Sequence, residues 1–387
     1  MEPLVLRDTA RNQAGLPDLA LMLAKRSAGF RRSLPQSLLA SLAALVRTMN
    51  CYYSNLIEGH ATHPIDIDRA LKGNYSKNLA KRNLQLEATA HIAVQQWIDG
   101  GALKGHGVDV ESIREIHRRF CSELPEDLLV VDSPDAKKAT KVIPGELRTR
   151  DVVVGRHVAV SPGAVPRFLS RYQEVYRSLG AIDTVMAAAA AHHRLLWIHP
   201  FLDGNGRVAR LLSHAILLET LDTGAVWSIA RGLARNVTAY KDHLAACDQT
   251  RRNDLDGRGS LSEESLIAFT DFFLRTCIDQ VSFMEDLIQP DRLRARIRIW
   301  AEEEIRLGHL PAKSDAILEA VLYRGELPRA DLPGLAGTGD RQARRIASAL
   351  LAREVLQADS SRAPLRLAIP AVLASRWMPG LFPDQAA

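Results

Sequence analysis

Apolar residues recur at helical spacing along most of the chain. From about residue 35 to residue 58 they stand three or four positions apart, and Gly59 then supplies a helix stop. The same period predicts further helices over residues 83–97, from 110 onward, and over 164–179, 182–198, 206–220, 228–247 and 261–287. Because few segments alternate as strands do, the predicted fold class is all-α, a helical bundle.

Two segments depart from this pattern. Residues 145–155 are short, β-branched and bounded by glycines, which predicts a small β-hairpin. After residue 313, three short helices precede two strand-like runs, an order typical of a winged helix-turn-helix. The predicted helices of this tail are 314–323, 329–335 and 341–353, and the predicted strands are 355–358 and 365–369.

These patterns predict consecutive domains. The core would follow an N-terminal helical region, and a linker helix with breaker residues after it would separate the core from the tail. The predicted boundaries are 1–110 for the N-terminal region, with its long helix at about 37–59, then 111–287 for the core, 288–310 for the linker and 311–387 for the winged-helix domain.

Composition and charge narrow the class of protein. With 387 residues, of which 47% are hydrophobic and 25% charged, wholesale disorder is excluded, and a net charge of +5 permits an anionic ligand. The four cysteines form no CxxC pair, which argues against a disulfide framework or zinc ribbon and fits a reducing compartment. Charges near the start, and His192, His193 and Arg194 within the most apolar stretch, argue against a signal peptide and a membrane span. We therefore expect a cytoplasmic protein without membrane contact.

A glycine-containing loop joins two of the predicted helices. Pro200 disfavours the helical conformation at His199, so the first helix is expected to end just before it. Gly204 and Gly206 allow a tight turn and the close approach of a ligand to the backbone. A new helix starts at once, and its unpaired amide N–H groups and dipole favour an anion at this point.

The side chains beside this loop suit a metal-bound polyphosphate. Asp203 is a hard carboxylate ligand for Mg²⁺, and Arg207 and Arg210 can hold phosphate oxygens. His199 can accept a proton at neutral pH, so the arrangement favours phosphoryl or nucleotidyl transfer. One alternative is a plain turn capped by Asp203. The other is a zinc site, against which the arginines argue, built from His192, His193, His199 and Asp203.

Residues 199–210 match the signature HPFx(D/E)GNGRxxR position for position and so resemble the Fic family. The resemblance implies a Fic-type helical core and transfer of AMP from ATP to a Ser, Thr or Tyr hydroxyl of a protein, with release of pyrophosphate. It implies that His199 is the general base, that Asp203 binds Mg²⁺ and that Phe201 anchors the loop. The phosphate-binding residues that it implies are Gly204, Asn205, Gly206, Arg207 and Arg210.

A second motif lies at the end of the first long helix. Ser54 and Glu58 share a face at i and i+4, and a carboxylate there is unfavourable unless a cation lies opposite. The segment 54–59 resembles the [S/T]xxxE[G/N] inhibitory motif of Fic proteins that carry it upstream of the catalytic loop. The resemblance implies that Glu58 forms a salt bridge with Arg210 and excludes the γ-phosphate from its productive position. The alternative is a solvated glutamate near a helix end.

Two further segments resemble parts of the family. The predicted hairpin is similar to the flap that binds a target segment by strand addition, and it includes Gly145, Leu147 and Val152. Its alternative is a plain surface hairpin. Residues 240–248 are similar to a YYxxLxxAN stretch near the adenosine, which implies a nucleoside contact for Tyr240. The chain departs from that stretch at Lys241 and Asp248.

A different class of function also follows from the tail. Arg341, Arg344 and Arg345 share one face of the predicted recognition helix, which suits DNA phosphates, although the tail from residue 313 has 10 basic and 8 acidic side chains. The alternative function is therefore a DNA-binding transcriptional regulator with a nucleotide-sensing core. Within the Fic resemblance, AMP removal by Glu58-activated water or another nucleotidyl transfer also stays open. The expected partners are ATP, a protein target and a second copy of the chain.

Overall fold

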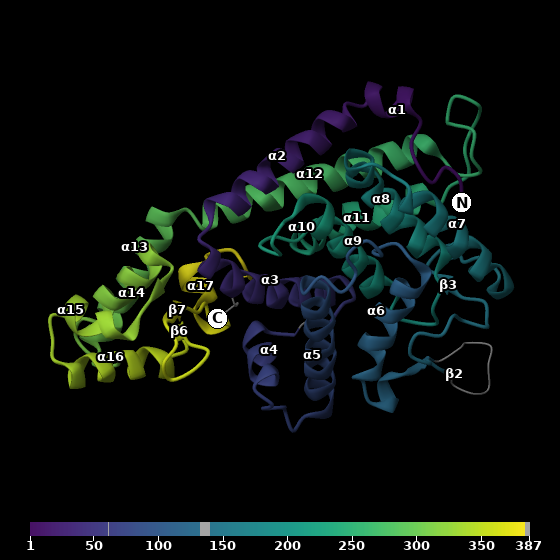
Figure 1. Ribbon diagram of the computed structural model, residues 1–387. Coiled ribbons are helices and arrows are strands. Elements are labelled where there is room, and N and C mark those ends of the chain that lie inside the picture. The colour runs from purple at the N-terminus through teal and green to yellow at the C-terminus, as the bar shows by residue number, and fades with distance from the viewer. Residues whose placement is uncertain (61, 132–139, 384–387) are drawn as a thin grey trace. The chain divides into compact units, whose positions relative to one another are not determined.

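The computed structural model describes residues 1–60, 62–131 and 140–383 (Figure 1). Helices dominate this part of the chain, so the predicted all-α class is confirmed. Up to residue 287 the helices are α1 (Asp8–Gln13), α2 (Leu16–Ser33), α3 (Gln36–Ile57), α4 (Pro64–Leu71), α5 (Leu79–Asp99), α6 (Val110–Ser122), α7 (Val165–Arg177), α8 (Ala181–Ile198), α9 (Asn205–Leu221), α10 (Ala230–Arg235), α11 (Val237–Cys247) and α12 (Glu263–Leu287). After these come α13 (Pro290–Arg306), α14 (Ser314–Arg324), α15 (Leu332–Ala336), α16 (Asp340–Ala352) and α17 (Ala374–Trp377).

The chain forms two compact units that alternate along the sequence. The first consists of Met1–Gly29, Asn50–Thr223 and Ser228–Val281. The second consists of Phe30–Met49, Gly224–Trp227 and Ser282–Ala387. Three helices, α2, α3 and α12, therefore contribute residues to both units.

The centre of the first unit is the pair α8 and α9. Helix α8 packs against α7 and α9, and α9 also contacts α5 and α6. The alanines at 187–191 in α8 are all buried, and such small side chains allow helices to pack closely. The loop of residues 199–204 joins these two buried helices, so both of its ends are fixed by packing.

Two short antiparallel ladders also lie in the first unit. They pair β1 (Val130–Val131) with β2 (Thr140–Lys141), and β3 (Val153–Val154) with β4 (His157–Val158). The β3–β4 hairpin is the one that the sequence predicted, but its predicted position over 145–155 is wrong. Gly155, with φ of +60°, lies in the turn between the strands, whereas the prediction placed it at the end of the hairpin.

The single helix predicted over 228–247 is also wrong. Asn236 separates α10 from α11 with backbone angles of −117° and 37°. Its side-chain amide donates to the carbonyl oxygen of Gly232 at 3.0 Å. Side chains of this type compete with the helical backbone for hydrogen bonds, which accounts for the break.

The second unit contains three strands after α13. They form an antiparallel sheet in the order β5 (Glu326–Leu327), β7 (Leu365–Leu367), β6 (Leu356–Gln357), of which the sequence predicted the last two. On α16, Ala343 and Ile346 are buried, while the three arginines of the predicted basic face are exposed. The assignment of a winged helix and any role in DNA binding stay predictions.

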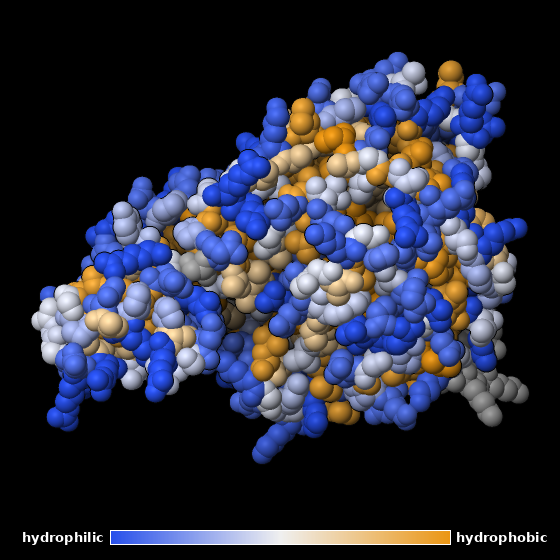
Figure 2. All heavy atoms as spheres, in the orientation of Figure 1, coloured by the Kyte–Doolittle hydropathy of each residue, from blue (hydrophilic) through white to orange (hydrophobic). Residues whose placement is uncertain are grey.

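Side chains at the surface are mostly hydrophilic. The face seen in Figure 2 is largely covered by them, with apolar side chains scattered between. Among the apolar side chains that are exposed, Val153, Val154 and Val158 all belong to the β3–β4 hairpin. None of the helices in the described ranges combines the length and the apolar character that a membrane span requires.

Candidate functional site

The loop between α8 and α9 is closed by its own asparagine. The Asn205 side chain accepts from the backbone N–H of Phe201 at 3.0 Å and donates to the Phe201 carbonyl at 2.8 Å. Gly204 takes a φ of +79° directly before α9 begins. A left-handed backbone of this kind favours glycine, which explains the residue at that position. The Asn205 side chain therefore shapes the loop and does not bind the N–H groups of the first turn of α9.

Phe201 anchors the loop on α6. Its ring is fully buried and stacks on His117, with centroids 3.9 Å apart and planes 2° from parallel. The backbone N–H of Gly145 donates to His117 Nδ1 at 2.8 Å. A Cβ at Gly145 would lie 2.9 Å from Cβ of Arg118, so only glycine fits there. Gly145, expected in the flap, thus supports the loop from behind, and His117 was not singled out from the sequence.

His199 ends α8 in the left-handed conformation, with φ of 50° and ψ of 65°. Its Nδ1 lies 3.3 Å from the carbonyl oxygen of Leu196. Because a carbonyl oxygen only accepts, Nδ1 carries the proton and Nε2 keeps its lone pair. Burial lowers the pKa of His199 to about 4, despite the opposing effect of the bond to Leu196. The imidazole is therefore neutral at pH 7 and can take a proton at Nε2.

Arg210 is enclosed by the end of α3. Its Nε donates to Ser54 Oγ at 2.8 Å, and its Nη2 donates to the Ser54 carbonyl at 3.3 Å. The same Nη2 forms an ion pair with Oε1 of Glu58. The structure thus brings Ser54, Glu58 and Arg210 together. The Arg210 side chain is 3% exposed and that of Glu58 is 34% exposed, so the carboxylate is the partner that can leave.

The Glu58 carboxylate lies over the first turn of α9. A Cβ on Gly206 would collide with Oε1 of Glu58 and would lie 3.1 Å from Nη1 of Arg210. The first N–H groups of a helix have no intrahelical acceptor and attract anions. Burial alone would raise the pKa of Glu58, but Arg210, with help from Arg207 and His60, lowers it. An ionised carboxylate therefore stands where this helix end would receive an anionic ligand.

Arg207 forms an ion pair with a residue of α5. Its Nη2 lies 2.5 Å from Oε2 of Glu87 and 3.2 Å from Nδ1 of His60. The guanidinium also stands 5.1 Å from the ring centre of Phe120, within the range of a cation–π contact. The side chains of Arg207 and Glu87 are only 8% and 9% exposed, so this ion pair is buried. The sequence did not point to Glu87 or His60.

Replacing Glu87 with Gln is expected to lower the free energy of unfolding by about 3 kcal/mol, because removal of one partner strands a buried charge. Urea denaturation followed by circular dichroism measures the change. The matched control is Glu264→Gln, since Glu264 pairs with Arg252 while both side chains are more than two-thirds exposed. That exposed pair is expected to contribute less than about 1 kcal/mol. Equal losses in the two variants would contradict a structural role for the Glu87–Arg207 pair.

Asp203 is the Mg²⁺ ligand that the sequence predicts in this loop. It is exposed, and its Oδ1 accepts from the N–H of Gly204 at 2.7 Å, which leaves Oδ2 for another partner. Mg²⁺ is commonly bound by one or two carboxylates, with waters and substrate phosphates filling the other positions, so the residues fit this ion. Among the described residues, no group of three or more His, Cys, Asp and Glu side chains could hold a metal, and the zinc alternative finds no support.

Tyr240 lies in the core behind Arg210. Its hydroxyl is 2.6 Å from Nε2 of His192, whose Nδ1 is 2.8 Å from Oγ of Ser213. Burial raises the pKa of Tyr240 to about 12, against the opposing effect of Arg210, to which it also hydrogen-bonds. Only 2% of Tyr240 is exposed, and the structure therefore places this residue among the groups that fix Arg210.

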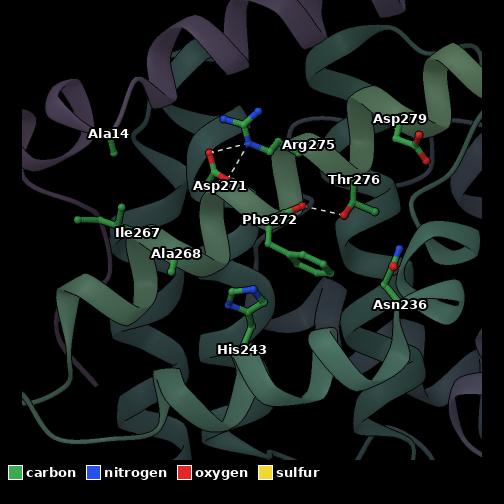
Figure 3. Close-up of a pocket in the computed structure, with 10 residues that line it drawn as sticks. All are labelled: Ala14, Asn236, His243, Ile267, Ala268, Asp271, Phe272, Arg275, Thr276 and Asp279. Carbon is green, nitrogen blue, oxygen red and sulfur yellow. Dashed lines mark hydrogen bonds and ion pairs between the residues drawn. The ribbon is translucent and has the colours of Figure 1, made fainter.

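A separate cavity of about 640 Å³ lies along α12 (Figure 3). His243 of α11 and Phe272 of α12 face each other in it, with ring centres 4.8 Å apart. Its charged groups are partly paired already, since Arg275 Nε is 2.8 Å from the Asp271 carboxylate. No residue of the segment 199–210 lines this cavity, and no group in the cavity points to a particular ligand. The loop therefore stays the candidate site.

Comparison with known proteins points the same way. The Fic/DOC family model matches residues 107–217, which include the whole loop. The chain is 30% identical over 125 residues to the Protein adenylyltransferase Fic of Drosophila erecta and 31% identical to that of Drosophila willistoni. Each match covers 32% of this chain and 22% of the relative, so the chain spans about a fifth of the length of these relatives.

Solved structures are similar over a larger part of the chain. A Fic family protein from Desulfovibrio desulfuricans G20 superposes with a TM-score of 0.52 and 17% identity, covering 91% of this chain and 95% of that one. Fic-1 (aa134 - 508) from C. elegans gives a TM-score of 0.55 and 18% identity, covering 73% and 75%. At these identities the likeness shows the fold.

Proposed function

Because this chain is a Fic family protein, we propose that it is a protein adenylyltransferase. It transfers AMP from ATP to a Ser, Thr or Tyr hydroxyl of a target protein and releases pyrophosphate. The observation that carries this proposal is that one short loop joins a neutral His199, at the end of α8, to the first turn of α9 and to Arg210 in the same helix. A proton acceptor and a phosphate-binding site are thereby held a few residues apart.

The two ends of the loop have different roles in the proposed reaction: His199 accepts the proton, and the start of α9 binds the phosphates. Nε2 of His199 takes the proton of the target hydroxyl, whose oxygen then attacks the α-phosphorus of ATP. The bond from that phosphorus to the pyrophosphate oxygen breaks, and pyrophosphate leaves with the electron pair. The N–H groups at the start of α9, the guanidinium of Arg210 and the remaining donors of Arg207 stabilise the phosphate charges. Asp203 would hold Mg²⁺, which neutralises phosphate charge when bound.

Autoinhibition is the second part of the proposal. Glu58 forms an ion pair with the guanidinium of Arg210 and fills the space above Gly206. It therefore competes with the terminal phosphates of ATP for both positions. The 34% exposure of its side chain allows it to move aside. The activity of the unmodified chain is therefore limited by the fraction of molecules in which Glu58 has released Arg210.

The position of the label in ATP tests the reaction type. A Glu58→Gly variant incubated with MgATP is expected to transfer label to protein from α-³²P-ATP and none from γ-³²P-ATP, with a mass gain of one AMP. The double variant Glu58→Gly/His199→Ala, which lacks the proposed base, is the control and is expected to stay unlabelled. Transfer from the γ-position would show that the loop carries out phosphorylation instead, and would overturn the proposal.

A further inference from the structure

Every carbonyl group at the end of α8 has a hydrogen-bond donor. The carbonyl of Leu195 accepts from the backbone N–H of His199 at 3.0 Å, and that of Leu196 accepts from its Nδ1. The next carbonyl, of Trp197, accepts from Nε2 of His157 in β4 at 2.8 Å. The last carbonyls of a helix ordinarily lack partners within the helix. Here a side chain of the β3–β4 hairpin, His157, is the partner of one of these carbonyls.

One arginine supplies the donors for the following three carbonyls. Arg148 donates from Nη2 to Ile198 at 3.4 Å, from Nε to His199 at 2.7 Å, and from its backbone N–H to Pro200 at 2.9 Å. The backbone of His199 is therefore held on both sides by this one residue. The left-handed conformation of His199 is held by these bonds.

The same guanidinium also holds the base of the hairpin. Its Nη1 donates to the carbonyl of Arg150 at 2.8 Å, just before β3, and its Nη2 donates to the carbonyl of Val160, just after β4. The two ends of the hairpin are thus joined through one side chain to the backbone of His199. Arg148 is 3% exposed and belongs to the first unit, as do all these partners.

The surroundings of Arg148 favour a guanidinium, which is a planar cation with several N–H donors. Among the residues that the structure describes, no carboxylate lies within ion-pair distance of its guanidinium, which is surrounded by carbonyl oxygens. Burial lowers the pKa of Arg148, and Asp151 acts against this shift. The negative end of the α8 dipole compensates further for the buried charge. A lysine could keep the charge but could not reach both sides of the hairpin and the helix end at once.

We propose that Arg148 is a positioning residue that locks the β3–β4 hairpin to the backbone of His199. A target segment that pairs with the exposed edge of the hairpin then presents its hydroxyl to Nε2 at a fixed distance. This inference rests on the proposed adenylyltransferase function. Arg148 then sets the distance between the docked target segment and Nε2 of His199. Loss of Arg148 therefore impairs transfer to protein more than it impairs nucleotide binding.

Partition of AMP between protein and water tests this role. The full chain carrying Glu58→Gly is compared with Glu58→Gly/Arg148→Met and Glu58→Gly/Arg148→Lys, each incubated with α-³²P-MgATP. Label on the chain itself and free AMP formed by hydrolysis are counted in the same sample. Arg148→Met is expected to lower the ratio of labelled protein to free AMP on the order of 10-fold, since small misplacements of reacting groups have effects of this size or larger. Arg148→Lys is expected to restore part of the ratio.

A matched variant separates positioning from stability. Arg194 is a buried arginine of α8, but it donates to the carbonyls of Pro3 and Cys247 and does not touch the hairpin. Arg194→Met is expected to lower the unfolding midpoint without changing the ratio. Binding of MgATP, measured by calorimetry, is expected to stay within about 2-fold in all variants that fold. An unchanged ratio in Arg148→Met, or an equal change in Arg194→Met, overturns the positioning role.

The two proposals can fail separately. If the Glu58→Gly chain with Arg148 intact forms neither labelled protein nor AMP, the adenylyltransferase proposal fails. If it forms both, and only the effect of Arg148→Met is missing, the proposed function stands and the positioning role of Arg148 fails.

Discussion

Glu58→Gly is expected to raise the rate of AMP transfer roughly 10- to 100-fold, the range of a typical coupling between two competing sites. In the unmodified chain the Glu58 carboxylate holds Arg210 and stands over Gly206, so ATP must first displace it. Removal of the side chain frees both positions at once. The initial rate of label incorporation from α-³²P-MgATP, at an ATP concentration below saturation, measures the change.

The control for this variant must also introduce a glycine directly after a helix, so that the added backbone flexibility is the same. Glu123 directly follows α6 as Glu58 directly follows α3, it is exposed, and no arginine of the loop lies against it. Glu123→Gly is therefore expected to leave the rate unchanged within about 2-fold, since surface changes of this kind have small effects. A rate in Glu58→Gly that equals or falls below that of the unmodified chain would show that Glu58 does not inhibit transfer. The Glu58–Arg210 pair would then be structural.

The loop could be predicted because its determinants are local. Pro200 ends α8, Gly204 supplies the positive φ, and the signature spacing places His199 and Arg210 at fixed positions relative to the start of α9. The helix that carries Ser54 also follows from its apolar period. Local patterns of this kind determine where an element begins and ends, and which side chains leave it on one face.

The partners across the fold could not be predicted in the same way. Glu87 meets Arg207 from another helix, and Arg148 meets the end of α8 from a loop, so no spacing along the sequence connects either pair. One signal was present for α5, because Glu87, His91 and Gln95 follow one another at i, i+4 and i+8 on a buried face. A polar stripe on a buried helix face requires partners, and it could have indicated that α5 faces charged residues.

His199→Ala in the Glu58→Gly background is expected to lower the rate of AMP transfer by about 10²- to 10⁴-fold, as is usual for loss of a positioned base. The pKa of His199 is lowered to about 4 by burial, so the imidazole that is lost is the neutral, proton-accepting form. No donor to the phosphates is removed with it. The affinity for MgATP, measured by calorimetry, is therefore expected to stay within about 2-fold.

The left-handed backbone of His199 calls for a second variant. Alanine is disfavoured at a φ of 50°, so His199→Ala could disturb the loop as well as remove the base. Asparagine adopts this conformation more readily and cannot accept a proton at neutral pH, so His199→Asn keeps the loop and loses only the chemistry. Both variants are expected to be equally inactive and to bind MgATP equally. If His199→Asn keeps more than a tenth of the transfer rate, a group other than His199 removes the proton from the target hydroxyl.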